Sequence, residues 1–350
     1  MLARARSIRR KGFKKYKGSA KKICTQIVNE CWNKTYFQTS TGHFKAFYIR
    51  DFCIATEGLL KLGYREEIRK TLQYALAIYS RENTIATTIA RDRPLHVYEY
   101  SPDSLPMLLR SIRIAQAHDI LKVYLPFIEL QISNYFNEVF DLNTGLISEK
   151  KFSSMKDNFT RKSSCYDNCM LAMLKDELEK LDIFNPFTGY DTKEKIKENF
   201  WNGKYFYDDL NKKKYVAGDA NTFPFWCDIF DEQDMFNSCL KEIQKNNLDK
   251  PWPLKYTKKR LQKPMFPLNM LLPDYETNTI WMHLGLCFIE SVQKFDKKLA
   301  DNYLKKYTEV IETNKNFLEI FDSHGKPLIK NLYAADESMI WAAAYLNLYR

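Results

Sequence analysis

Apolar residues recur every three or four positions along most of this chain, and that spacing is typical of amphipathic or buried helices. The pattern predicts helices over residues 51–62, 65–81, 103–118, 121–140, 162–181, 280–293, 299–313 and 335–349. The alternation typical of strands is confined to residues 204–207 and a few residues around 214–216. We therefore predict an all-α fold with short β-hairpin insertions.

The order of the predicted elements narrows the architecture. Long helices alternate with loops, and the 350 residues leave room for about twelve helices. The sequence shows no fixed-period repeat, which argues against a solenoid. A toroid of paired helices fits this order better than a bundle does. The Pro-rich stretch 250–276 is expected to be a long loop within the domain, and loops of that length are usually functional.

Positive charge is concentrated at the start of the chain. The net charge is +11, and the first 22 residues carry ten Lys or Arg and no acid. Because the remaining body is close to neutral, we expect neither a nucleic-acid nor a membrane partner. We interpret residues 1–22 as a basic arm that is solvated or packed on the body, with contact to an anionic partner as the open alternative. Residues 23–350 are predicted to form one barrel domain, of unspecified oligomeric state.

Missing motifs disfavour several classes of chemistry. The sequence contains no GxSxG, GxGxxG, GxxxxGK[ST] or HExxH motif. Its eight cysteines form no CxxC motif, and no histidine lies close enough to a cysteine pair in sequence to complete a zinc site. We therefore expect no metal, no organic cofactor, and reduced cysteines in the core. Reduced thiols, with no secretory apolar segment and no 18-residue apolar run, favour a cytoplasmic location.

Acidic and aromatic residues at the predicted helix ends are the remaining candidates for chemistry. Glycoside hydrolysis needs two carboxylates, one protonated and one ionised. Arg50 and Asp51 directly precede an apolar helix, beside Tyr48, and are suited to bind sugar hydroxyls. The alternative interpretation of this pair is a helix N-cap with a neighbouring cation.

At this point the sequence resembles the glucoamylase family of glycoside hydrolases. The stretch FYIRDFCIATEGLLKLGYREEIRKTL, residues 47–72, is similar to a family segment with an aromatic-rich strand, Arg-Asp, a helix and a Leu-x-x-Gly-Tyr turn. In that family the Arg-Asp pair binds the terminal glucose. The resemblance therefore assigns substrate binding to Arg50 and Asp51, and Tyr48 is carried with them as a candidate.

A second segment, LNTGLISE at residues 142–149, resembles the part of glucoamylases and amylo-1,6-glucosidases that carries the general acid. The family spacing to a later Arg and Asn favours Glu149, with Arg161 as a candidate binding residue, although the Trp before the acid is absent. Asp157 is the first rival for the acid. Asp167, in a run similar to the acid loop of trehalase-like enzymes, is the second. The alternative for each is an ordinary surface or capping carboxylate.

Later segments extend the resemblance over about residues 40–350. Gly218-Asp219-Ala220 is similar to a family Leu-Asp-Ala-Ser segment, which makes Asp219 a candidate binding residue, although it also reads as a turn and cap. Trp281 begins an apolar helix where the family places an aromatic residue near the sugar, although a core role is the alternative. The run FLEIFDSHGKP, residues 317–327, resembles the segment with the general base and assigns that role to Glu319.

The resemblance implies an (α/α)6 barrel of the six-hairpin glycosidase superfamily and hydrolysis of an oligosaccharide or other glycoside. The implied reaction is inverting, exo-acting and α-glucosidic, with one of the three acid candidates facing Glu319. The alternatives are a phosphorylase or lyase on the same fold, or a relic that binds glycan without cleaving it. Lys258, Lys259, Arg260 and Lys263 are the candidate cations for a phosphate site.

Overall fold

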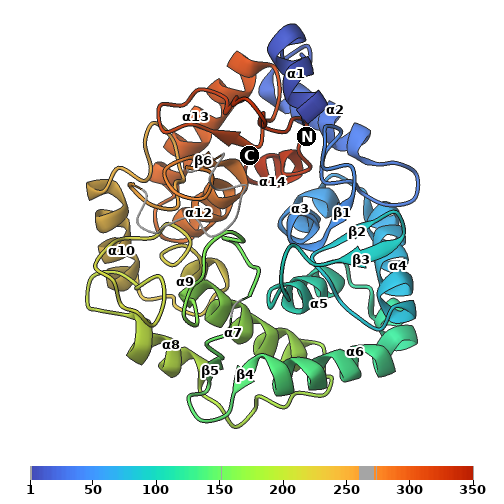
Figure 1. Cartoon of the computed structure of the whole chain (residues 1–350), viewed down its shortest axis with the longest axis vertical. Helices are drawn as coiled ribbons and strands as arrows, with labels where there is room; N and C mark the ends of the chain where they lie inside the picture. Colours follow the sequence, from blue (N-terminus) through green and yellow to red (C-terminus); the bar gives the residue numbers. More distant parts are fainter. Residues whose placement is uncertain (1, 151, 260–271, 273, 350) are drawn as a thin grey trace.

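The computed structural model describes residues 2–150, 152–259, 272 and 274–349. Within these residues, pairs of helices follow one another around a closed ring (Figure 1). The inner helices are α3 (Ile49–Lys61), α5 (Ser104–Ile114), α7 (Cys165–Lys180), α9 (Phe223–Trp226), α12 (Met282–Phe295) and α14 (Ala342–Leu348). The outer helices are α2 (Ala20–Cys31), α4 (Arg65–Arg81), α6 (His118–Glu138), α8 (Thr192–Phe200), α10 (Gln233–Lys245) and α13 (Lys297–Asn314).

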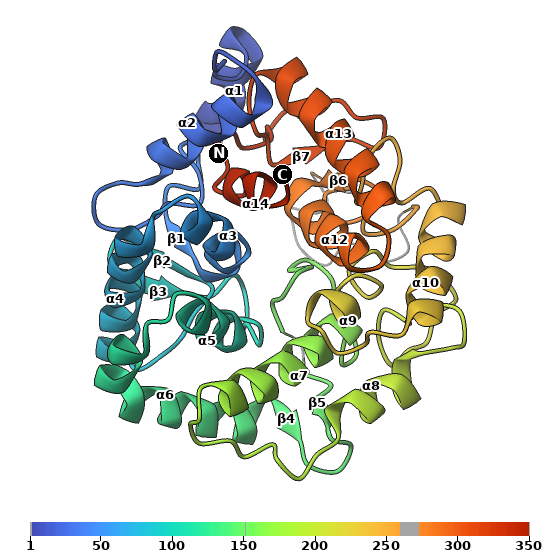
Figure 2. The same ribbon diagram turned by 180° about the vertical axis from the view of Figure 1, so that it is seen from behind.

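Contacts between consecutive inner helices close the ring. Each of the six packs against its neighbours, and α14 returns to pack on α3 (Figure 2). The close approach of α3 and α14 depends on Gly58, because a Cβ there would lie 2.1 Å from the carbonyl oxygen of Ala343. The prediction of an all-α toroid of paired helices is confirmed.

Short antiparallel strand pairs lie in the connections between the helices of the ring. β1 (Phe47–Tyr48), β2 (Thr88–Ala90) and β3 (Arg93–Leu95) form one sheet, and β4 (Phe140–Asp141) pairs with β5 (Leu146–Ile147). β6 (Ile280–Trp281) pairs with β7 (Ile320–Phe321), with Trp281 opposite Ile320. Glu319 directly precedes β7. The pairing of β6 with β7 therefore places Glu319 beside Met282, the first residue of α12.

Two predictions from periodicity need correction. Residues 214–216 form no strand. Residues 204–207 belong to a tight antiparallel turn, which an isolated bridge between Trp201 and Phe206 closes. The last helix begins at Ala342 rather than at residue 335. Residues 335–341 are held in a loop because their backbone amides bind other elements; the amide of Ser338, for example, donates to Asn316 Oδ1 at 2.9 Å.

The first residues of the chain are ordered on the barrel. Residues 2–11 form α1 (Leu2–Lys11), and α2 begins at Ala20, within the span interpreted as a basic arm. Ala5 and Ile8 are buried against Ala334. Residues 1–22 were interpreted as solvated, packed on the body or bound to an anionic partner. Packing on the body is the interpretation that describes α1.

Apolar side chains fill the space between the inner and outer rings in one continuous core. All eight cysteines are buried in this packing and free, as predicted. None of the helices in the described ranges combines the length and apolar character needed to cross a bilayer.

Candidate active site

A cavity of about 220 Å³ opens where several inner helices begin. Its wall includes Arg50 and Asp51 from the first turn of α3, and Trp281 directly before α12. Loops supply further lining residues, among them Asp157 and Glu319. The fold thus brings together residues from the first half and the last quarter of the chain in one concave, partly apolar site, the usual form of a small-molecule pocket.

Glu319 is buried in the cavity wall and surrounded by hydrogen-bond donors. Its Oε1 accepts a hydrogen bond from the hydroxyl of Tyr275 at 3.0 Å. Its Oε2 accepts one from the hydroxyl of Tyr333 and one from the backbone amide of Asp336, the latter at 2.7 Å. Burial raises the pKa of Glu319 to about 7, and the nearby Asp336 carboxylate adds to the effect. Three donors orient the carboxylate and favour its ionised form.

Asp157 also lines the cavity, on the loop between β5 and α7. Its Oδ1 has no hydrogen-bond partner among the described residues, although it is buried. Burial raises the pKa of Asp157 well above its ordinary value, and the carboxylate of Glu276 raises it further, against the opposing charge of Arg50. A carboxyl group in this environment retains its proton more readily and can donate it.

Glu276 holds the backbone on both sides of the Asp157 carbonyl. Its carboxylate accepts hydrogen bonds from the backbone amides of Asp157 at 3.2 Å and Asn158 at 2.9 Å. It also accepts one from the Asn158 side-chain amide at 2.8 Å. Burial raises the pKa of Glu276 to about 7, despite these donors. Two buried carboxyl groups therefore lie near each other at this side of the cavity.

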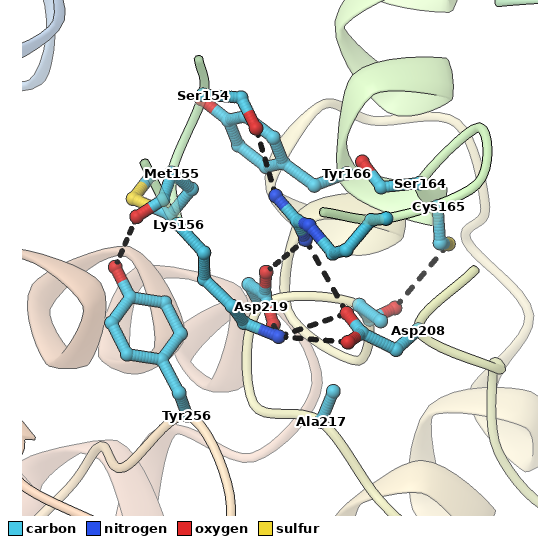
Figure 3. Close-up of polar contacts among 12 residues, drawn as sticks. Ser154, Met155, Lys156, Ser164, Cys165, Tyr166, Asp208, Ala217, Asp219 and Tyr256 are labelled. Carbon is cyan, nitrogen blue, oxygen red and sulfur yellow. Dashed lines mark hydrogen bonds and ion pairs between the residues drawn. The ribbon is translucent and has the colours of Figure 1, made fainter. Parts of the chain in front are cut away.

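A buried group of four charges holds the same loop (Figure 3). The ammonium group of Lys156 lies 2.9 Å from Asp208 Oδ1 and 3.2 Å from Asp219 Oδ1. The guanidinium group of Arg161 pairs with the same two carboxylates, at 3.3 Å from Asp208 and 2.8 Å from Asp219. We call these four residues the charge cluster. Because Lys156 and Arg161 flank Asp157 in sequence, the cluster restrains the segment that carries it.

The charge cluster is well compensated. Burial alone would raise the pKa of Asp208, but Lys156, Arg161 and the hydroxyl of Tyr215 lower it to about 2. The Arg161 guanidinium also donates to Ser154 Oγ at 2.8 Å. Buried charges are tolerated when each is paired and hydrogen-bonded in this way.

Arg50 and Asp51 lie in the cavity wall, where the resemblance places substrate binding. Arg50 Nε donates to Asp103 Oδ2 at 2.7 Å, whereas its buried Nη2 has no partner within the described part of the chain. Trp341 Nε1 donates to Asp51 Oδ1 at 2.8 Å. Burial raises the pKa of Asp51 to about 6, although Arg50 acts in the opposite direction. The pair presents one cationic donor and one acceptor to the cavity.

Aromatic side chains form much of the remaining wall. Trp281 contacts Tyr275 edge to face, with 4.8 Å between the ring centres, and its indole N–H donates to the Tyr275 carbonyl oxygen at 2.7 Å. Tyr48, from β1, also lines the cavity, and burial raises its pKa to about 12. Aromatic faces of this kind suit the C–H faces of sugar rings while hydroxyl and amide groups bind the sugar oxygens.

Four of the residues predicted from sequence do not line the cavity. Glu149 lies on the surface, where its side chain is 55% exposed and pairs with Lys162 at 2.9 Å. Asp167 sits in the first turn of α7 and accepts a hydrogen bond from the N-cap residue Ser164. Arg161 and Asp219 belong to the charge cluster. The structure therefore separates these four from Asp157, Glu319, Arg50, Asp51, Tyr48 and Trp281, which meet at the cavity.

The candidate phosphate-binding cations can be placed only in part. Lys258 and Lys259 are described and do not line the cavity. Arg260 and Lys263 lie outside the described residues.

Several residues that line the cavity were not predicted as site residues from the sequence. Tyr275 and Glu276 lie at the end of the Pro-rich 250–276 stretch, part of which lies outside the described residues. No periodic pattern marks them, although a loop of the expected length was itself a functional signal. His283 and Trp341 were hidden within apolar helical runs. Burial and Arg50 lower the pKa of His283 to about 3, so it is a neutral wall residue.

Comparisons with known proteins give a fold but no close relative. No family model and no curated protein matches the sequence. A GH63 mannosylglycerate hydrolase from Thermus thermophilus, in complex with Tris and D-glycerate, is similar with a TM-score of 0.67 and 9% identity, over 94% of this chain and 99% of that one. A glycosidase in complex with glucose is similar with a TM-score of 0.69 and 10% identity, over 99% and 96% of the two chains.

A third similar structure extends the range of sugars among the neighbours. A rhamnosidase from Klebsiella oxytoca with rhamnose bound has a TM-score of 0.66 and 9% identity, over 93% of this chain and 63% of that one. Identities this low establish shared architecture rather than shared substrate. The chain shares the (α/α)6-barrel fold of these similar structures.

Proposed function

We propose that this protein is a glycoside hydrolase in which Asp157 is the general acid and Glu319 the general base. The supporting observation is the meeting of these two carboxyl groups, from segments far apart in sequence, in one cavity with Arg50 and Asp51. The similar folds of named glycosidases agree with this reaction class. Glu149 takes no part in the proposal because its carboxylate is on the surface.

The environments of the two carboxyl groups suit opposite roles. Asp157 has a free oxygen and a pKa raised well above normal, which suits donation of a proton to the glycosidic oxygen. Glu319 is held by three donors that favour the anion, which suits removal of a proton from water. Burial raises the pKa of both carboxyl groups. Hydrogen-bond donors oppose this rise at Glu319, whereas the carboxylate of Glu276 adds to it at Asp157.

The proposed reaction is a single displacement with inversion. The bond between the anomeric carbon and the glycosidic oxygen breaks while Asp157 transfers its proton to that oxygen. A water oxygen bonds to the anomeric carbon from the opposite face, and Glu319 takes one of its protons. This geometry requires carboxyl groups about 6.5–9.5 Å apart, with the water between them.

Arg50 and Asp51 are proposed to bind the terminal sugar. The unpartnered Arg50 Nη2 can donate to a hydroxyl oxygen, and Asp51 can accept from a neighbouring hydroxyl. Binding energy at the non-reacting end then orients the scissile bond. We propose exo action on a small α-glucoside or oligosaccharide, on the strength of the glucoamylase-like segments.

We also propose a cytoplasmic location, because buried free thiols are typical of proteins in a reducing compartment.

A panel of α- and β-linked glucosides, mannosides and rhamnosides tests the proposal, with release of monosaccharide as the readout. The wild-type protein is expected to release sugar from at least one member without added phosphate. Glu319→Gln is expected to abolish release, and Asp157→Asn to lower it by about 10²- to 10⁴-fold on substrates with a poor leaving group. Glu149→Gln, the matched surface control, is expected to retain it. Release that requires phosphate would indicate a phosphorylase, and sugar binding without release would indicate a non-catalytic barrel; either result contradicts the proposal.

A further inference from the structure

The first residues of the chain contact the loop before α14 through buried polar groups. Arg4 Nη2 forms an ion pair with Glu337 Oε1, and the backbone amide of Lys14 donates to Glu337 Oε2 at 2.6 Å. The hydroxyl of Tyr16 lies 2.9 Å from Ser338 Oγ. Because Glu337 and Ser338 are both buried, the N-terminal residues supply partners that water does not.

Apolar and backbone contacts add to this attachment. Ala5 and Ile8 bury their side chains against Ala334. Arg9 Nη2 donates to the Asn331 carbonyl oxygen at 2.8 Å. Residues 2–16, which we call the N-terminal segment, therefore cover one side of the loop between residues 331 and 338.

The other side of the same loop holds the candidate general base. The backbone amide of Asp336 and the hydroxyl of Tyr333 both donate to Glu319 Oε2. The backbone amide of Glu319 in turn donates to the Asp336 carbonyl oxygen at 2.9 Å. The next residue, Glu337, forms a bridge with Leu318. One residue of the loop thus binds the base, and its immediate neighbour binds the N-terminal segment.

We propose that the N-terminal segment is a positioning element for Glu319, acting through Glu337, Ser338 and the loop that they share with Asp336. This inference rests on the proposed function for its catalytic consequence. It assigns a role in catalysis to the basic arm, whose described residues do not line the cavity. A base that must accept a proton from one fixed water tolerates little displacement, so a loop held only from the inside would lose part of the rate.

Two substitutions weaken the attachment of the N-terminal segment without touching the cavity. Arg4→Ala removes the ion pair to Glu337, and Ile8→Ala removes apolar contact with Ala334. Arg6→Ala is the matched control, because Arg6 is exposed on the same helix. Arg4→Lys is the conservative variant and is expected to restore part of the effect. Far-UV circular dichroism and the unfolding temperature check that each variant is folded.

Amide hydrogen exchange on the full chain tests the coupling without any substrate. In the Arg4→Ala/Ile8→Ala variant we expect α1 to exchange faster, together with residues 317–321 and 333–338, by about 5- to 10-fold. Unchanged exchange at residues 317–321 would overturn the proposal, whether or not α1 itself exchanges faster. This outcome stays readable if the wild-type protein releases no sugar, in which case the proposed function fails separately.

Kinetics on a cleaved substrate test the catalytic consequence. The double variant is expected to lower kcat by about 3- to 10-fold with KM within about twofold, because the base rather than the sugar-binding pair is displaced. The groups that face Glu319 are Tyr275, Tyr333, Asp336 and His43. Water admitted among them would lower the pKa of Glu319, so the acidic limb of kcat/KM is expected to move to lower pH. An unchanged kcat and an unchanged limb would overturn the proposal.

Discussion

The carboxylate of Glu276 accepts a hydrogen bond from the backbone amide of Asp157 at 3.2 Å. The contact joins two loops that are 119 residues apart in sequence. It fixes the candidate acid in place and also sets a second buried carboxyl group beside it. Burial and this proximity raise the pKa of Asp157 well above its ordinary value.

Glu276→Gln is expected to change the pH dependence of the reaction. The acid must be protonated to act, so its pKa sets the alkaline limb of kcat/KM. Removing the neighbouring carboxylate lowers that pKa, and the alkaline limb is therefore expected to move to lower pH. A pH profile of kcat/KM for the two proteins makes the measurement. An alkaline limb that stays in place would show that Glu276 does not influence the acid.

Asp157→Asn is expected to lower kcat by about 10²- to 10⁴-fold on a substrate with a poor leaving group, because no proton reaches the departing oxygen. On an aryl glycoside with a good leaving group the loss should be much smaller. Glu149→Gln is the control and is expected to be nearly wild type, because an exposed ion pair contributes little. Equal losses on both substrates would remove Asp157 from the role of acid.

Lys156→Met is expected to destabilise the protein by about 3–5 kcal/mol, because Asp208 and Asp219 would keep only one of their two cations in a buried site. Urea unfolding followed by circular dichroism gives the free energy. Lys162→Met is the matched control, since the Lys162 side chain is exposed and its loss should change stability by less than about 1 kcal/mol. Equal effects of the two substitutions would argue against the charge cluster as an anchor of the loop.

Glu319→Gln is expected to stabilise the fold in a pH-dependent way. The folded pKa of about 7 lies above the ordinary value of 4.5, so the native state holds the proton more tightly than the unfolded chain. The wild-type protein therefore loses stability as pH rises from 4.5 to 7, by roughly 1–3 kcal/mol. The Gln variant is spared this loss and should exceed wild type at pH 8 but not at pH 4. A constant difference across pH would contradict the raised pKa.

Hydrophobic periodicity predicted several of the helices that present one face to the core. It did not predict α2, α8 and α10, although each of these also has a buried and an exposed face. α4 and α13 alternate buried and exposed positions in this way and were found close to their predicted bounds. α9 was not predicted by periodicity because all four of its side chains are buried, which leaves no polar face. Residues 335–341 looked helical because they are apolar, but tertiary hydrogen bonds such as that of Ser338 hold them in a loop.

Local motifs located part of the site. Arg50, Asp51 and Glu319 each lie in a segment with its own recognisable neighbours, and all three line the cavity. The family spacing favoured Glu149 over Asp157, whereas Asp157 is the one that lines the cavity. Spacing does not give the direction of a loop side chain, which depends on distant partners. Lys162 holds Glu149 at the surface, whereas Glu276 and the charge cluster hold the loop so that Asp157 lines the cavity.

The most direct test of the proposed mechanism is a proton NMR measurement of the sugar that the wild-type protein first releases from a cleaved glycoside, with Glu319→Gln in parallel. The proposed mechanism predicts a product with the anomeric configuration opposite to that of the substrate, and no release by the Glu319→Gln protein. A product of retained configuration, or full activity in the Glu319→Gln protein, would contradict a single displacement with Glu319 as the base.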